Sequence, residues 1–186
     1  MSVERWRLFI AAPLPDRAAA ALWESLAALR GRHLEARWTA PGQLHATLAF
    51  VGSTDPQRVP DITAAISRVA ATSAAFDVLM GEGSGRAGGS RGGVAWLRLA
   101  GGREQLEHVA IAVDREIGSG LYSAATPPRP HVTVARRVDE RLLADLRAVA
   151  SQLYVPWRAE RIVLYRSHTS SRGSRYEELS TSDLAG

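Results

Sequence analysis

Two short segments of the chain carry the same pattern, a histidine and a threonine two positions apart in an apolar run. They read LHATLAF at 44–50 and PHVTVAR at 130–136. Successive side chains of a β-strand point to opposite faces. Each segment would therefore present one imidazole and one hydroxyl on one face, and apolar residues on the other. The spacing predicts two related strands, each with a polar pair on a single face.

The residues around these strands extend the likeness between the two halves of the chain. A turn and a helix of similar length follow each strand, over about 55–71 and 139–151. Apolar spacing predicts further helices over 16–31 and 101–118, and strands over 7–12, 76–80, 94–99, 158–167 and 174–179. This alternation of helices, strands and hairpins indicates an α+β fold with antiparallel sheet. We expect a single domain, 1–186, of two pseudo-symmetric lobes that face each other.

A glycine-rich segment, GEGSGRAGGSRGG at 81–93, separates two of the expected strands. It lacks the strand-to-helix context of a nucleotide-binding glycine motif. We predict a loop here, with two interpretations left open. It is either a hairpin tip without a ligand, or a loop whose Arg86 or Arg91 touches a phosphate of bound RNA.

Composition removes several kinds of chemistry. The chain has no cysteine, which excludes disulfides, thiolate nucleophiles and cysteine zinc sites. All 23 basic residues are arginine, so the lysine of a phosphate-binding loop or a Schiff base is absent as well. The formal net charge is +4. Because arginine binds phosphate through two parallel hydrogen bonds, this charge favours an anionic or nucleic-acid partner.

The sequence shows no sign of a membrane segment. No apolar run reaches the ~18 residues that span a bilayer. The N-terminal residues MSVERWRLFIAAPLP lack the pattern of a signal peptide. We expect a cytoplasmic protein, a monomer, without a membrane partner.

The two histidines allow more than one chemistry. Zinc normally takes three or four protein ligands, and no Asp or Glu lies in or beside either motif. A serine nucleophile would need a G-x-S-x-G on a strand-to-helix turn, which the expected elements do not provide. Two unrelated strands, each with a hydrogen-bonded histidine, are a further alternative. Two copies with threonine at the same offset favour a site instead.

Two facing imidazoles suit the cleavage of a phosphate ester. One imidazole, neutral, accepts a proton from the attacking oxygen, and the other, charged, donates a proton to the leaving oxygen. A threonine hydroxyl on the same face can donate to a non-bridging phosphate oxygen as charge builds. The motifs therefore predict phosphodiester chemistry without a metal or another cofactor.

Five blocks of the sequence resemble the two-histidine phosphoesterases. Within that group the chain is similar to the bacterial and archaeal RNA 2′,3′-cyclic phosphodiesterases, long called 2′-5′ RNA ligases. The blocks are RLFIAAPLP, RWTAPGQLHATLAFVG, GGVAWLRL, RPHVTVAR and LYRSHTSSRGSRYEEL. Ala46 departs from the family, where a larger aliphatic residue is usual, and the glycine-rich segment has no counterpart.

The resemblance implies two pseudo-symmetric lobes around a central cleft, each with an antiparallel sheet and flanking helices. It implies metal-independent hydrolysis of an RNA 2′,3′-cyclic phosphate to a 2′-phosphate, with O3′ as the leaving group. His45 and His131 carry over as catalytic residues, and Thr47 and Thr133 as phosphate-binding residues. His45 would be the acid and His131 the base, although pseudo-symmetry also allows the reverse.

Six further residues are possible substrate contacts. Arg129 and Arg136 flank the second motif and could reach a phosphate, or lie in solvent at the strand ends. Trp38 and Phe50 flank the first motif, and either pack in the core or stack on a base. Tyr176 and His168 belong to the closing hairpin, near the expected cleft. The other histidines, His33 and His108, are predicted to lie on the surface.

Three functions follow from these residues. The first is hydrolysis of cyclic-ended RNA or of a cyclic nucleotide. The second is ATP-independent joining of 2′-5′ linked RNA at the same site, since the forward and reverse steps share acid and base. The third is an RNA-binding module with weak or no catalysis.

Overall fold

A computed structural model describes residues 4–86, 92–170 and 173–186. The helices are α1 (Asp16–Ser25), α2 (Ala27–Arg32), α3 (Val59–Thr72), α4 (Arg103–Ile117) and α5 (Glu140–Ala150), with 3₁₀ turns η1 (Pro41–Gln43) and η2 (Pro56–Arg58). The strands are β1 (Trp6–Pro13), β2 (Arg37–Trp38), β3 (His45–Thr54), β4 (Phe76–Arg86), β5 (Val94–Gly101), β6 (His131–Arg136), β7 (Pro156–Ala159), β8 (Arg161–Ser170) and β9 (Gly173–Asp183). The predicted α+β class is confirmed.

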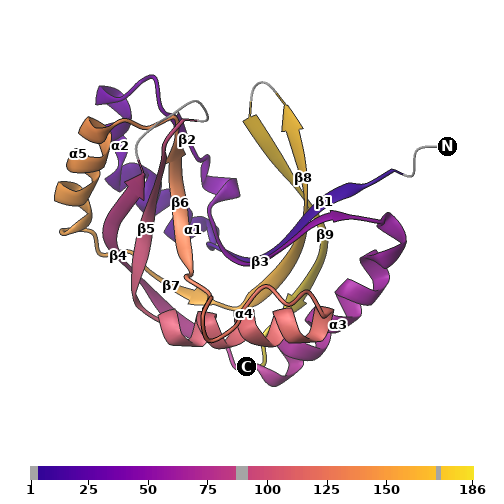
Figure 1. Cartoon of the computed structure of the whole chain (residues 1–186). Coiled ribbons are helices and arrows are strands. Elements are labelled where there is room, and N and C mark those ends of the chain that lie inside the picture. Colours follow the sequence, from indigo (N-terminus) through magenta and orange to yellow (C-terminus); the bar gives the residue numbers. More distant parts are fainter. Residues whose placement is uncertain (1–3, 87–91, 171–172) are drawn as a thin grey trace.

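The strands form one curled antiparallel sheet with the two His-x-Thr strands at its centre. Its order is β7-β4-β5-β6-β3-β1-β8-β9, and β2 pairs with β6. A single register pair, Ala46 opposite Val132, joins β3 to β6. The two halves of the sheet therefore stand as two walls: a first wall of β3, β1, β8 and β9, and a second wall of β6, β5, β4 and β7. Figure 1 shows the helices on the outside of the curl.

The two halves of the chain repeat the order strand–helix–strand–helix–strand, with their last strands exchanged. In the first half, β4 follows α3 but pairs with β5 and β7 of the second wall. In the second half, β7 follows α5 and stays in the second wall, whereas β8, the next strand, pairs with β1 of the first wall. Each wall is thus built from both halves of the sequence.

The glycine-rich segment is partly a strand. Three of its glycines alternate along β4: Gly81, Gly83 and Gly85. A Cβ added at Gly83 would lie 2.9 Å from the side chain of Leu146 in α5. The glycines therefore allow the helix to pack closely on the strand, and the prediction of a loop over 81–93 is wrong for 81–86. Residues 87–91, Arg91 among them, lie outside the described part of the chain.

Most apolar side chains form one core between the sheet and the helices, and a second, smaller cluster lies in the first wall. The buried residues of α3, α4 and α5 recur at helical spacing and pack in this core. The single helix expected over 16–31 is interrupted at Leu26, whose ψ is 5°. The second cluster comprises Phe9, Ala11, Val163 and Tyr165, with Tyr176 against it. Within the residues described, no helix is long and apolar enough to cross a membrane.

Candidate active site

All four residues of the two motifs line one cleft between the walls. His45 and Thr47 project from β3, and His131 and Thr133 from β6, into a space of about 1160 Å³. The apolar residues between them, including Ala46 and Val132, are fully buried. The alternation predicted from the sequence therefore places both polar pairs on the same side of the sheet.

A β-bulge in β3 determines that Phe50 lines the cleft together with His45 and Thr47. The register with β1 passes from Thr47 to Ala49 and leaves Leu48 without a partner. One extra residue reverses the faces of the residues that follow. Ala49 is accordingly buried, and Phe50, 60% exposed, lines the cleft.

A β-bulge of the same kind occurs in β6. The register with β5 skips Val134, so that Ala135 is buried and Arg136 lines the cleft. Each motif thus reads His-x-Thr-x-Ala and is followed by a cleft residue. The repeated alanine is the signal in the sequence that could have revealed both bulges.

The two imidazoles are held in the same way. Nδ1 of His45 donates to the carbonyl of Gln43 at 2.7 Å, and Nδ1 of His131 donates to the carbonyl of Arg129 at 2.9 Å. A carbonyl oxygen only accepts, so each Nδ1 carries the proton in the neutral ring. Nε2 is then the atom that each ring offers for proton transfer.

The surroundings of the two imidazoles differ. His45 lies among aromatic rings, with ring centroids 5.1 Å from Phe9 and 5.4 Å from Tyr176. Burial, together with the nearby charges of Arg136 and His131, lowers the pKa of His45 to about 4, against the raising effect of the hydrogen bond to the Gln43 carbonyl. With this pKa, His45 is neutral at pH 7.

His131 has a more open setting. Its ring packs beside Trp96 of β5, with centroids 5.5 Å apart. The hydroxyls of Thr47 and Thr133 have no hydrogen-bond partner among the residues that the structure describes. Both hydroxyls are thus available to donate to a bound anion.

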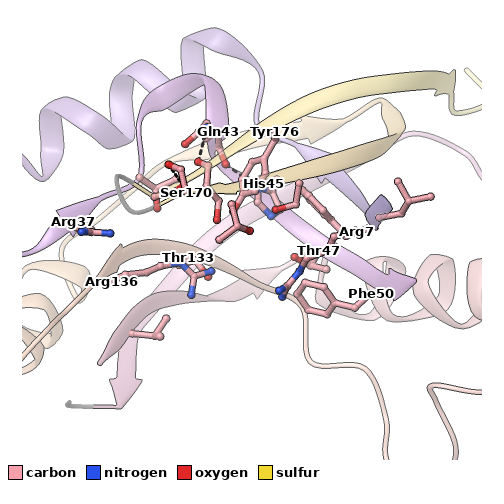
Figure 2. A pocket seen from close by; sticks show the side chains of 18 of the residues that line it. Arg7, Arg37, Gln43, His45, Thr47, Phe50, Thr133, Arg136, Ser170 and Tyr176 are labelled. Atoms are coloured by element: carbon pink, nitrogen blue, oxygen red, sulfur yellow. Dashed lines mark hydrogen bonds between the residues drawn. The ribbon is translucent and has the colours of Figure 1, made fainter. Parts of the chain in front are cut away.

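Arginines lie at both ends of the cleft. Figure 2 shows Arg37 and Arg136 on one side of His45, and Arg7 with Phe50 on the other. Arg137 also lines the cleft. In the described parts of the chain, no three His, Asp or Glu side chains gather as a set of metal ligands. The arrangement combines two imidazoles, two hydroxyls and several guanidinium groups, which suits a phosphate ester within a longer anion.

Comparison with protein families identifies this architecture. A family model described as the 2′-5′ RNA ligase superfamily matches residues 15–170. The chain belongs to this superfamily. The resemblance drawn from the five sequence blocks is confirmed.

Individual superfamily members are similar over nearly their full length. An RNA 2′,3′-cyclic phosphodiesterase of Thermus thermophilus is 30% identical, over 97% of this chain and 91% of the relative. The crystal structure of TT0787 from the same organism has a TM-score of 0.75 at 26% identity and covers 97% of this chain and 98% of that one. Escherichia coli LigT, crystallised with 3′-AMP, has a TM-score of 0.73 at 22% identity and covers 98% and 100%. These structures share the fold of this superfamily member.

The structure brings most of the other predicted contacts of this superfamily member to the cleft. The lining includes Trp38, Phe50, Arg136 and Tyr176. The ring of Tyr176 packs edge-on against the ring of His45 in this lining.

Three predicted contacts lie elsewhere. Arg129 contributes its carbonyl to His131, but its side chain is not part of the cleft lining. His168 lies outside the lining and pairs with Glu177 at 2.6 Å, because its neighbours Ser167 and Thr169 take the cleft face of β8. The side chain of Arg86, at the end of β4, is likewise not part of the lining.

One prediction about the remaining histidines is wrong. The side chain of His33 is only 8% exposed and binds Asp145 of α5 through a 2.9 Å contact. This hydrogen bond lowers the pKa of Asp145. The sequence concealed the pair because His33, directly after α2, and Asp145, on α5, are distant in the chain. His108 is exposed, as predicted.

Sequence reasoning missed several residues of the cleft. Arg7, Arg37 and Arg137 line it, and Phe9 and Tyr165 form the aromatic surroundings of His45. Arg7 and Phe9 lie on β1 beside β3, Arg37 lies on β2 beside β6, and Arg137 follows β6 directly. Tyr165 lies on β8, one strand further from β3. Only the strand order reveals them, because no local pattern marks an arginine as facing a cleft.

Proposed function

We propose that this protein hydrolyses RNA 2′,3′-cyclic phosphate ends to 2′-phosphates without a metal ion or other cofactor. The observation that carries the proposal is the matched pair of imidazoles, each with Nδ1 bound to the carbonyl two residues before it. The name of the Thermus relative, an RNA 2′,3′-cyclic phosphodiesterase, supports the same reaction. Thr47 and Thr133 line the same cleft as the two imidazoles, and their hydroxyl groups support phosphate as the reacting group.

The proposed reaction is one displacement at phosphorus. Nε2 of the neutral imidazole takes a proton from water as the water oxygen attacks. The bond from phosphorus to O3′ breaks, and Nε2–H of the charged imidazole gives its proton to O3′. The products are a 2′-phosphate and a free 3′-hydroxyl. Thr47 and Thr133 donate to the non-bridging oxygens while their charge increases.

The division of roles between the imidazoles depends on the bound phosphate. An acid role for His45 requires its pKa to rise from about 4 to about 7. That change corresponds to about 4 kcal/mol. One negative charge ~4 Å away supplies about 4 kcal/mol at an effective dielectric constant of ~20. The substrate's charge is therefore sufficient, and the role implied by family resemblance, His45 as acid and His131 as base, stays our assignment.

The cleft also suits the rest of an RNA end. Guanidinium groups at both ends fit backbone phosphates, and Phe50 and Trp38 offer surfaces on which a base can stack. The crystal structure of LigT in complex with 3′-AMP supports a nucleotide as the ligand. Joining of RNA ends would use the same groups, with a 5′-hydroxyl in place of water. A cytoplasmic location and a monomeric state stay predictions.

The test is incubation with an RNA oligonucleotide that ends in a 2′,3′-cyclic phosphate, in the presence of EDTA. We expect a 2′-phosphate product from the wild-type protein. The Thr47→Val and Thr133→Val variants should be slower by about 10- to 100-fold, because each lacks one phosphate donor. Adding an RNA with a free 5′-hydroxyl tests joining. Loss of activity with EDTA, a 3′-phosphate product, or binding without turnover would each contradict the proposal.

A further inference from the structure

Three arginines gather at one end of the cleft, beyond the reacting groups. Arg37 of β2 lies directly opposite Arg136 of β6, and Arg137 follows at the end of the strand. Like charges directly opposite each other in a sheet destabilise the pairing. In the described parts of the chain, the guanidinium groups of Arg136 and Arg137 have no carboxylate or hydrogen-bond partner. Among the described residues, the positive charges of Arg136 and Arg137 are therefore not paired with a carboxylate.

The backbone at Arg137 explains how consecutive arginines reach the same cleft. Strand alternation would send Arg136 and Arg137 to opposite faces. Arg137 instead has φ of 58°, in the left-handed region that side chains with a Cβ rarely adopt, and it has the one positive φ among the described non-glycine residues. The chain turns there, and both side chains line the cleft.

Two glycines at the end of the glycine-rich segment accommodate this turn. The N–H of Arg137 donates to the carbonyl of Gly93 at 2.8 Å. A Cβ at Gly92 would lie 3.3 Å from Cα of Arg137, and one at Gly93 would lie 2.3 Å from the carbonyl of Val138. The unfavourable conformation of Arg137 is thus held by neighbours that leave room for it. Strained residues of this kind concentrate where a side chain has a functional role.

Arg136 and Arg137 differ in their distance from the reaction. The charge of Arg136 acts on His45, which places it close to the reacting phosphate. Arg137 lies one residue further along the wall, away from both motifs. The two consecutive arginines could therefore bind two neighbouring anions, the reacting phosphate at Arg136 and a second phosphate at Arg137.

We infer that Arg137 binds the phosphate that joins the last two nucleotides of the RNA, so that the enzyme prefers RNA ends over cyclic mononucleotides. This inference rests on the proposed function and specifies its substrate. Arg136 faces the reacting phosphate, and Arg137 faces the next phosphate on the 5′ side. The guanidinium of Arg137 forms charge-assisted hydrogen bonds with that group and adds no contact to a nucleoside that lacks it.

A comparison of three substrates isolates the effect of this phosphate from the effects of other parts of the RNA. The substrates are adenosine 2′,3′-cyclic phosphate, the same nucleotide with an added 5′-phosphate, and the dinucleotide ApA with a 2′,3′-cyclic end. For the wild-type protein, we expect the 5′-phosphate to raise kcat/KM about tenfold, the scale of one charge-assisted hydrogen bond at an open site. ApA should show at least the same increase.

The decisive variant is Arg137→Gly. Glycine adopts a positive φ without strain, so the change removes the side chain while it preserves the backbone. The ratio of kcat/KM with and without the 5′-phosphate should fall from about tenfold to about twofold. Arg137→Lys, which keeps the charge but not the two-pronged geometry, should keep part of the ratio. Arg147→Ala, which removes one arginine from the outer helix α5, should keep the full wild-type ratio.

The outcomes distinguish the inference from the function on which it rests. If the wild-type protein hydrolyses all three substrates with equal kcat/KM, the inference is wrong and the proposed function stands. Equal losses of Arg137→Gly on all three substrates would also overturn it, since the residue would then serve the reacting phosphate or the fold. If the wild-type protein hydrolyses none of them, the proposed function fails instead.

Discussion

The buried, neutral state of His45 should make the stability of the protein depend on pH. The folded pKa of about 4 lies below the ordinary value of 6.5 that the ring regains on unfolding. Between these values the unfolded chain binds a proton that the folded protein does not. Stability contributed by this site is therefore present above about pH 6.5 and is lost as the pH falls toward 4.

The size of the effect follows from the two pKa values. At pH 4.5 the unfolded ring is almost fully protonated, whereas the folded ring is mostly neutral. Each unit of difference corresponds to 1.36 kcal/mol, so lowering the pH from 7 to 4.5 should cost about 2.5 kcal/mol at this residue. That loss is a large part of the stability of a typical domain.

His45→Asn removes the titration and keeps an amide N–H in the approximate position of the Nδ1–H that donates to Gln43. Urea unfolding of both proteins at pH 7 and pH 4.5, followed by tryptophan fluorescence, gives the two free-energy differences. We expect the wild-type protein to lose about 2.5 kcal/mol more than the variant. His108→Asn, which removes an exposed imidazole on α4, should retain the wild-type dependence. An equal loss in the wild-type protein and in His45→Asn would refute the view that the aromatic rings hold His45 neutral.

Four further predictions concern catalysis and packing. His45→Ala and His131→Ala should each lower kcat by at least ~100-fold on cyclic-ended RNA, and activity that survives both changes would place the reaction elsewhere. The pH profile of kcat/KM should be bell-shaped, because the pair of imidazoles must hold one proton in total; the acid limb should lie near pH 4, and a rate that does not fall there would contradict the coupled pair. With sulfur in place of O3′, His45→Ala should recover activity and His131→Ala should not, since thiolate leaves without an acid; the opposite recovery would reverse the two roles. Gly83→Ala should destabilise the fold by about 1–3 kcal/mol in thermal or urea unfolding, because a Cβ would meet Leu146; unchanged stability would contradict this close packing.

The periodic parts of the fold were predictable from the sequence. The strands of His45 and His131 and the inner faces of α3, α4 and α5 follow from the spacing of apolar residues, which burial enforces directly. The four motif residues of the cleft follow from the same alternation. Such patterns are local, and a single sequence displays them completely.

The parts that were not predictable depend on contacts between distant segments. Gly83 belongs to a strand because α5 packs on it, although glycine runs usually indicate loops. The side chain of His33, at the end of α2, is buried where Asp145 of α5 binds it. Arg37 reaches the cleft because β2 pairs with β6. None of these contacts leaves a periodic signal near the residue concerned.

The exchange of β4 and β8 between the two walls means that neither half of the chain can form a complete wall alone. A chain cut between β4 and β5 would yield one piece with β4 but without its neighbours β5 and β7, and another with β8 but without β1. The relation is that of a domain-swapped dimer in which both partners belong to one polypeptide. Each histidine strand thus stands in a wall completed by the opposite half, and the two imidazoles come together only when the whole chain has folded.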